Sequence, residues 1–341
     1  MDKQIVFVAK NKAELLDVES QPLGENQIRV KTVFSTISNG TERANLTGDP
    51  TIGIYVKQGS AAEFPRVLGY STSGIVVEKG EKVKKFEIGD RVAMCRTSHR
   101  SYNVVDERSA VKIESENVSF EEASIAYISA FPLAAIRKTR LEIGESAMVM
   151  GLGILGLLAV EFAHAAGAVP VIAVDPVKKR REKALKFGAD YAFDPFEENF
   201  AEKVKAVTNG GVNAAIEVTG QGAGLNETLD CMARFGRVAL LGCTRNSDFT
   251  VDYYRKVHGP GISLIGAHTL ARPNEESYPG YFTTEDDMKS FLKLCANNRI
   301  NVRDIIEETH SPAECTEVYE RLAYDKNFPT VVQFDWGRTE G

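Results

Sequence analysis

Short hydrophobic runs recur along the whole chain, and their spacing changes at about residue 118. Before that point the runs are rich in β-branched residues and are separated by Gly, Asp and Asn, which is typical of β-strands and turns. We expect strands at Gln4–Ala9, Ile28–Ile37, Ser73–Glu78, Arg91–Cys95, Tyr102–Val105 and Ala110–Ile113. The pattern therefore predicts an all-β, barrel-like first domain. Between Ser38 and Val67 it dissolves into small and polar residues, and a loop of that length is usually functional or mobile.

From about residue 119 hydrophobic runs and helical patterns alternate. The runs fall at Ala147–Met150, Val169–Val174, Tyr191–Phe193, Val212–Val218, Arg237–Leu241 and Ile262–Ala267, with helical patterns between the first five. Such alternation implies right-handed crossovers and a parallel sheet. The second domain is therefore expected to be α/β, with a doubly wound six-stranded parallel sheet that binds a nucleotide.

A glycine motif follows the first strand of this predicted sheet. Gly151, Gly153 and Gly156 have the spacing G-x-G-x-x-G, and a helical pattern runs from Ile154 to Ala166. The first glycine permits a tight turn, the second lets a pyrophosphate approach the backbone, and the third lets the helix pack closely on the strand. The N-terminus of that helix would face the phosphates. The motif therefore predicts a dinucleotide site.

Asp175 ends the next hydrophobic run, about 20 residues beyond the motif, where such sites carry an acidic residue for the ribose. A carboxylate there accepts hydrogen bonds from the ribose diol and repels a 2′-phosphate, so we expect NAD in preference to NADP. The basic cluster at 178–181 could serve a 2′-phosphate, but a solvated helix face is the favoured interpretation of those charges.

The residues after about 269 return to mixed structure, with two helix starts. Thr284 and Asp287 have the spacing of a capping box. A hydrophobic stripe of helical period follows, made of Met288, Phe291, Leu292 and Cys295. Ser311–Glu314 predicts a second helix start, with Pro at the first helical position. Pro329–Trp336 indicates a final strand.

Composition narrows the class of protein. The chain is 43% hydrophobic and 26% charged, with a net charge of −6, which is ordinary for a globular protein and argues against nucleic-acid or anionic-membrane partners. The chain shows neither a secretory signal nor a membrane-spanning run. Its five cysteines are widely spaced, which suits reduced thiols. We therefore expect a cytoplasmic protein with a small-molecule substrate.

Several glycine motifs together resemble one family. In order they are Gly69 with Gly74, Gly89–Val92, the triad beginning at Gly151, Ile216–Gly220 and Gly236–Gly242. On these residues the chain resembles the medium-chain dehydrogenase/reductase superfamily, the alcohol-dehydrogenase-like proteins. The resemblance implies a GroES-like β-barrel catalytic domain at 1–118, a Rossmann NAD-binding domain at 119–268, and a tail at 269–341 that returns to the catalytic domain. It also implies cofactor contacts at Gly151, Gly153, Ile154, Leu155, Gly156, Asp175, Thr219, Gly242 and Ala267.

The superfamily's zinc ligands do not stand at the matching positions. Zinc-dependent members carry a Cys, a His and a third Cys, Asp or Glu where the resemblance aligns Ser38, Tyr70 and Tyr127. Neutral hydroxyls are poor zinc ligands, because zinc sites use thiolate, imidazole or carboxylate. The run of four cysteines that holds the family's structural zinc is missing as well. We therefore expect a zinc-free branch member with no metal site.

Without zinc, a side chain must take or give the hydroxyl proton. The candidates are Tyr70, Tyr127, Thr41 and His99, and for each a packed or structural role stays open. Ser38 and Glu42 are expected at the substrate, although Glu42 could be a solvated loop charge. The run from Ser38 to Glu42 resembles the branch that contains bacteriochlorophyllide-type and sugar- or cyclitol-related dehydrogenases.

These residues predict a zinc-independent, NAD(H)-dependent oxidoreductase that interconverts a secondary alcohol and a ketone. A sugar, cyclitol or polyol derivative is the expected substrate. Two alternatives stay open: a zinc-free enoyl or quinone reductase, and a non-catalytic nucleotide-binding protein. The resemblance further implies a homodimer, or a dimer of dimers, joined through the apolar edge strand at 262–267, unless the chain's own tail covers that edge.

Overall fold

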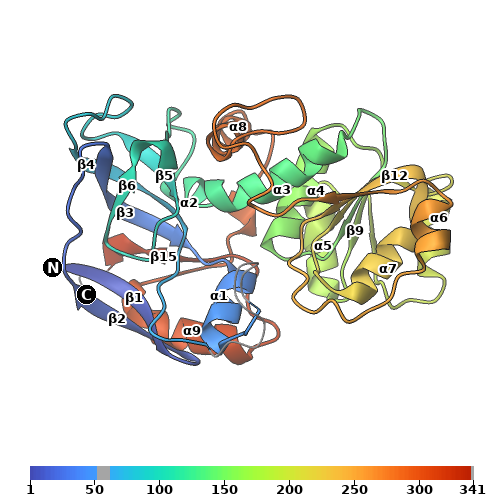
Figure 1. Ribbon diagram of the computed structural model, residues 1–341, viewed down its shortest axis with the longest axis horizontal. Helices are drawn as coiled ribbons and strands as arrows, with labels where there is room; N and C mark the ends of the chain where they lie inside the picture. The colour runs from blue at the N-terminus through green and yellow to red at the C-terminus, as the bar shows by residue number, and fades with distance from the viewer. Residues whose placement is uncertain (52–61, 339–341) are drawn as a thin grey trace. The chain divides into compact units, whose positions relative to one another are not determined.

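The computed structural model describes residues 1–51 and 62–338, and these form two compact units (Figure 1). The first comprises Met1–Ile128, Met288–Asn298 and Val302–Gly341; the second comprises Ser129–Asp287 and Arg299–Asn301. The divisions expected at 118 and 268 therefore shift. Buried Asp287 forms ion pairs with Arg137 at 2.9 Å and with Arg272 at 3.4 Å, which ties the stretch 269–287 to the second unit.

The strands of the first unit follow the alternating pattern closely. A seven-stranded sheet has the order β14-β15-β3-β4-β5-β7, with β6 paired to β3, and a separate hairpin joins β1 to β2. The expected strands form as β1 (Asp2–Ala9), β3 (Gln27–Thr36), β4 (Ser71–Lys79), β5 (Arg91–Cys95), β6 (Tyr102–Asp106) and β7 (Ala110–Lys112). The pattern missed β2 (Lys12–Val18) and β14 (Glu308–His310), while the final strand is β15 (Val332–Asp335).

A helix occupies part of the expected long loop. Helix α1 spans Asn39–Thr47 and ends at Gly48, whose φ is +69°. Its buried residues are Glu42, Ala44 and Leu46. Because one of these is charged and another is small, the sequence shows no hydrophobic stripe that would indicate a helix. The prediction of a continuous loop from Ser38 was therefore wrong here. The rest of that prediction falls partly on residues 52–61, which lie outside the described part.

The C-terminal residues complete the core of the first unit. Helix α9 (Cys315–Tyr324) lies along the β1–β2 hairpin (Figure 1) and follows the capping box that Ser311 forms with Glu314, as predicted. The core around it is largely aromatic and aliphatic: Ile5, Phe7, Ile37, Leu46, Tyr319, Phe334 and Trp336.

Helix α8 (Thr284–Ala296) buries the predicted stripe Met288, Phe291, Leu292 and Cys295. Its N-terminal cap lies one residue earlier than predicted. The Asp286 N–H donates to the Thr283 hydroxyl at 3.2 Å, and Asp287 forms the ion pairs with arginines instead. Thr283 with Asp286 and Thr284 with Asp287 have the same spacing, so the sequence did not show which threonine caps the helix.

The second unit is built on a six-stranded parallel sheet with the order β10-β9-β8-β11-β12-β13. The strands are β8 (Ala147–Met150), β9 (Val171–Val174), β10 (Tyr191–Phe193), β11 (Val212–Glu217), β12 (Met232–Leu240) and β13 (Ser263–Gly266). Helices α4 (Ile154–Ala165), α5 (Lys178–Lys186) and α7 (Gly222–Asp230) pack on it, beside α3 (Ala126–Thr139) and α6 (Phe200–Val207) (Figure 1).

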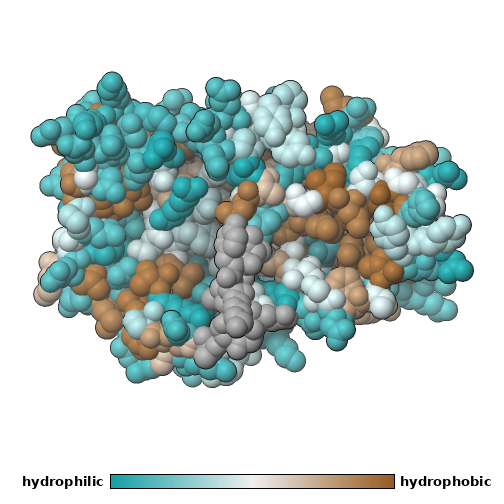
Figure 2. Space-filling view, in the orientation of Figure 1, coloured by the Kyte–Doolittle hydropathy of each residue, from teal (hydrophilic) through white to brown (hydrophobic). Residues whose placement is uncertain are grey.

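The strand order reverses direction between β8 and β11, which confirms the doubly wound prediction. In such sheets ligands bind outside the carboxyl ends of the strands at this switch point. Figure 2 shows hydrophobic residues at the surface over the sheet of this unit.

Candidate active site

The glycine turn after β8 has the geometry that the motif requires. Gly151 has φ +97°, a conformation that other residues rarely adopt. A Cβ on Gly156 would lie 1.8 Å from the Gly151 carbonyl oxygen, so any side chain there would displace the turn. A Cβ on Gly153, by contrast, would meet no described atom within 4 Å. Gly153 is the N-cap of α4 and leaves open space beside the helix N-terminus.

Asp175 follows β9 and is buried against the same turn. Its Oδ2 accepts the Leu152 N–H at 2.9 Å, and its Oδ1 accepts the Val177 N–H at 2.8 Å. Each carboxylate oxygen can accept a second hydrogen bond, so a ribose hydroxyl can still be recognised. Arg180 lies 3.5 Å from Oδ2. The carboxylate thus has a structural function that the sequence did not indicate, and it sits beside one arginine of the basic cluster.

The other predicted cofactor residues occupy neighbouring strand ends. Thr219, Gly242 and Ala267 follow β11, β12 and β13, while Ile154 and Leu155 begin α4. The turn at Thr219 is held by buried Glu217, whose Oε1 accepts the Thr219 N–H at 2.8 Å and whose Oε2 accepts the Gly220 N–H at 3.2 Å. Burial raises the pKa of Glu217, and these hydrogen bonds oppose the rise. Glu217 was missed as a site residue, although it lies in one of the recognised motifs.

This unit therefore fits a dinucleotide. Its predicted contacts gather at the carboxyl ends of adjacent strands, and the open position at Gly153 is where a pyrophosphate would approach the backbone.

In the first unit, three predicted residues from separate segments come together. Ser38 precedes α1, Tyr70 precedes β4, and Tyr127 lies in the first turn of α3. The Tyr70 hydroxyl donates to Ser38 Oγ, and the Tyr70 and Tyr127 rings meet nearly at right angles with centroids 5.5 Å apart. The resemblance placed these three at one ligand set, and the structure brings them together.

The surroundings of Tyr70 keep its hydroxyl protonated. Burial raises the pKa of Tyr70 well above its ordinary 10.0. Hydrogen bonds with the Ser38 and Thr41 side chains lower this pKa, whereas the charge of Glu42 raises it further. At neutral pH, Tyr70 is therefore a hydrogen-bond and proton donor, and Thr41 belongs to the same group of hydroxyls.

Glu42 and His99 lie deeper than predicted. Both are buried, and His99 Nε2 lies 3.1 Å from Glu42 Oε2. Glu42 Oε1 also accepts the Ser38 N–H at 2.9 Å, and Glu42 Oε2 accepts the Tyr319 hydroxyl at 2.6 Å. Burial and the Glu42 charge raise the pKa of Tyr319. Glu42 is thus no solvated loop charge. Sequence reasoning missed Tyr319, which the hydrophobic pattern presents only as a core position.

The other nitrogen of His99 completes this buried network. His99 Nδ1 lies 2.8 Å from Ser35 Oγ, which also accepts the indole N–H of Trp336 at 2.9 Å. The backbone on either side is fixed as well, because the His99 N–H donates to the Leu68 carbonyl at 2.8 Å. A Cβ on Gly69 would lie 2.4 Å from the imidazole, so His99 depends on a glycine there.

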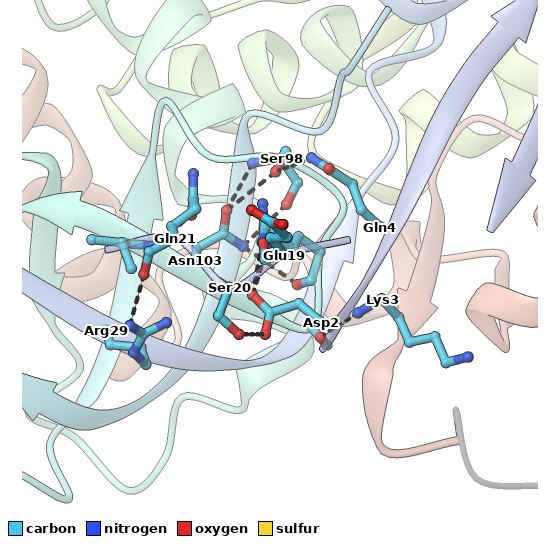
Figure 3. Close-up of polar contacts among 12 residues, drawn as sticks. Asp2, Lys3, Gln4, Glu19, Ser20, Gln21, Arg29, Ser98 and Asn103 are labelled. Carbon is cyan, nitrogen blue, oxygen red and sulfur yellow. Dashed lines mark hydrogen bonds and ion pairs between the residues drawn. The ribbon is translucent and has the colours of Figure 1, made fainter. Parts of the chain in front are cut away.

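Polar contacts shown in Figure 3 hold the loop that carries His99. Asn103 accepts the Ser98 N–H at 3.0 Å, and Gln4 donates to Ser98 Oγ at 3.1 Å. On the far side of the loop, Arg100 forms a buried ion pair with Asp2 at 2.9 Å. His99 is therefore held rigidly from both sides.

The residues at the family's zinc position do not fit that metal. Ser38, Tyr70 and Tyr127 offer neutral hydroxyls, which are poor zinc ligands. Over residues 1–51 and 62–338, no group of three or more His, Cys, Asp or Glu is placed to hold a metal ion. The five cysteines all lie in these described ranges; none of them is in a disulfide there, and Cys243 alone is exposed. Within the same ranges no helix is long and apolar enough to cross a bilayer.

A doubly wound sheet with its glycine turn in one unit, and a cluster of hydroxyls in a β-rich unit of the same chain, define a nucleotide-binding dehydrogenase. Residues 24–121 match the family "Alcohol dehydrogenase GroES-like domain", and residues 155–282 match "Zinc-binding dehydrogenase". The chain belongs to the medium-chain, alcohol-dehydrogenase-like superfamily and is an oxidoreductase acting on CH–OH groups.

Individual relatives agree with this assignment. L-threonine 3-dehydrogenase from Pyrococcus abyssi is 30% identical over 274 residues, covering 71% of this chain and 77% of the relative. D-guloside 3-dehydrogenase from Escherichia coli is 23% identical over 334 residues, covering 93% and 95%. The crystal structure of galactitol-1-phosphate dehydrogenase from Escherichia coli superposes with a TM-score of 0.82 at 17% identity, covering 98% of this chain and 99% of that one. This last likeness concerns the fold.

Proposed function

We propose that the protein is a zinc-independent, NAD(H)-dependent dehydrogenase that interconverts a secondary alcohol and a ketone on a sugar, cyclitol or polyol derivative. The observation that carries this proposal is the trio Ser38, Tyr70 and Tyr127, which gathers hydroxyls where relatives use zinc ligands. The full-length similarity to a D-guloside 3-dehydrogenase supports a polyhydroxylated substrate. Four of the five cysteines are buried and none is in a disulfide, which supports the proposal of a cytoplasmic protein.

A bound nicotinamide supplies the hydride acceptor or donor. The residues of this chain must then bind the dinucleotide and manage the proton. The glycine turn and Asp175 hold the pyrophosphate and the ribose. In ketone reduction the Tyr70 O–H turns from Ser38 Oγ to the substrate oxygen and gives that oxygen its proton. The Ser38 hydroxyl then donates to the resulting phenolate, which regains a proton from solvent. Alcohol oxidation reverses these steps.

A panel of polyols, cyclitols and ketones with NAD⁺ or NADH, followed by NADH absorbance, tests the function. We expect turnover of at least one member, unchanged by a chelator, and well under one zinc per chain by elemental analysis. Stoichiometric zinc would contradict the alignment of Ser38, Tyr70 and Tyr127. Turnover of enoyl compounds or quinones alone would favour a reductase. Nucleotide binding without any turnover would favour a non-catalytic protein.

The preference for NAD is tested by titrating both reduced nucleotides and following nicotinamide fluorescence. Since the proposal has Asp175 recognise the adenosine ribose, we expect NADH to bind at least about tenfold more tightly than NADPH, about 1.4 kcal/mol. Asp175→Asn should reduce this ratio. NADPH binding that equals or exceeds NADH binding would contradict the proposal. Arg180→Gln should then weaken NADPH selectively, because Arg180 lies beside Asp175.

We also propose a homodimer, or a dimer of dimers, joined through residues 262–267. Within the described residues β13 is an edge strand paired with β12 alone, and Leu264 on it is 40% exposed. An unpaired apolar edge can pair with its own copy across a two-fold axis.

Light scattering tests the assembly. Leu264→Asp should give a monomer near 37.4 kDa, because like charges would face each other across the axis. Leu185→Asp, on a leucine of the same unit with 47% exposure, should leave the dimer intact. A monomeric wild-type chain at micromolar concentration would refute the proposal.

A further inference from the structure

Ser38 occupies the N-cap of α1 but does not perform the usual function of that position. An N-cap serine normally accepts a backbone N–H of the first turn, and losing this bond destabilises the helix. In the described part of the chain, the Ser38 side chain caps no backbone N–H of α1 and instead accepts the Tyr70 hydroxyl. The helix start thus gives up a stabilising bond and retains an oriented hydroxyl.

The backbone of Ser38 is held from the opposite side by Glu42. The Ser38 N–H donates to Glu42 Oε1 at 2.9 Å, and the Glu42 N–H donates to the Ser38 carbonyl at 2.8 Å. These two bonds close one turn of chain around Ser38. The orientation of the Ser38 hydroxyl therefore depends on where the Glu42 carboxylate lies.

Two side chains from distant segments fix that carboxylate. The hydroxyl of Tyr319, on α9, donates to Oε2 at 2.6 Å, and His99 lies 3.1 Å from the same oxygen. A buried carboxylate is costly unless it is hydrogen-bonded, and these partners satisfy it. Because Glu42 is fully buried and its oxygens are already bonded inside the unit, direct binding of substrate is the weaker interpretation.

We propose that Glu42, held by Tyr319 and His99, is a positioning residue: it fixes Ser38 at the backbone and, through the Ser38 hydroxyl, orients the hydroxyl of Tyr70. This inference rests on the proposed function, in which Tyr70 contacts the substrate oxygen. It replaces the expectation that Glu42 binds substrate. It also gives Tyr319, in the C-terminal helix, a part in the reaction without contact with the reacting atoms.

The test uses Glu42→Gln and Tyr319→Phe in the full chain, each with a matched control. Tyr324→Phe removes an exposed hydroxyl on the same helix, which bonds Asn11 at 2.9 Å. Glu308→Gln alters another glutamate–histidine pair of the same unit, in which Glu308 lies 2.8 Å from His310. Because small misplacements of reacting groups cost large factors in rate, we expect kcat to fall about tenfold in both test variants. KM and the NADH Kd should stay within about twofold, and both controls should keep wild-type kcat.

Hydrogen–deuterium exchange provides a readout that needs no substrate. We expect faster exchange of the Ser38 amide in Tyr319→Phe, with the core strands β4 and β5 unchanged. A variant that lowers Tm and speeds exchange throughout the unit while keeping kcat would make the network merely structural and would overturn the proposal. A raised KM with unchanged kcat in Glu42→Gln would return Glu42 to the substrate and would also overturn it.

If the wild-type chain turns over no member of the panel, the proposed function fails. Hydrogen–deuterium exchange at the Ser38 amide is then the remaining test of the positioning network. Local acceleration at Ser38 would then still support the positioning network, and no change there would refute it.

Discussion

Tyr70→Phe should lower kcat by about 10²-fold or more while NADH binds as tightly as before. A positioned general acid or base contributes roughly 10²–10⁴-fold, and this change removes only the hydroxyl that donates to Ser38. The ring contact with Tyr127 is kept, so folding should be little affected. Steady-state rates of ketone reduction, with the NADH Kd measured separately, provide the test.

The pH dependence of the wild-type enzyme follows from the same surroundings. Reduction needs Tyr70 protonated, and its pKa lies above the ordinary 10.0 because of burial and Glu42. Tyr70 therefore causes no decline in kcat as the pH rises through the neutral and mildly alkaline range.

The kcat values of Tyr127→Phe and Thr41→Val show whether Tyr70 is the residue that transfers the proton. A loss in either that exceeds the loss in Tyr70→Phe would move the proton transfer to that residue.

Gly153→Val should abolish binding of both nucleotides and leave the fold intact. A Cβ at Gly153 meets no described atom within 4 Å, and φ there is −72°, which valine tolerates. The added methyl groups would fill the space where the pyrophosphate approaches the helix N-terminus. Fluorescence titration should show at least about a hundredfold weaker NADH binding, about 2.7 kcal/mol.

Gly156→Ala supplies the contrast, because its Cβ would strike the Gly151 carbonyl at 1.8 Å. That variant should lose stability as well as binding, with a lower Tm. Undiminished NADH affinity in a folded Gly153→Val protein would mean that the dinucleotide does not use this turn.

The sequence predicted the architecture well, because its hydrophobic residues follow clear strand and helix periodicities and the spacing of its glycines indicates a dinucleotide-binding turn. The turn at Gly151 and all six parallel strands form at the predicted runs, although β12 begins at Met232, earlier than the predicted Arg237. Helix α1 was missed because its buried stripe contains Glu42, which a hydrophobic pattern counts as solvated.

The candidate site was only partly predictable. Ser38, Tyr70 and Tyr127 could be grouped through the family resemblance, although three distant segments supply them. The link from Glu42 to Tyr319 spans 277 positions, and a buried tyrosine has the same pattern as any core residue. Only the folded chain shows which core hydroxyl faces the carboxylate.

Trp336 is the single tryptophan of the chain, and its indole N–H donates to Ser35 in the network that ends at Glu42. Excitation of intrinsic fluorescence at long ultraviolet wavelengths therefore reports on one place in the molecule. We expect a small molecule that reorders the hydroxyls around Ser38 to change this emission through the contacts Ser35–His99–Glu42. A fluorescence screen of a metabolite library could then test for ligands before any reaction is known.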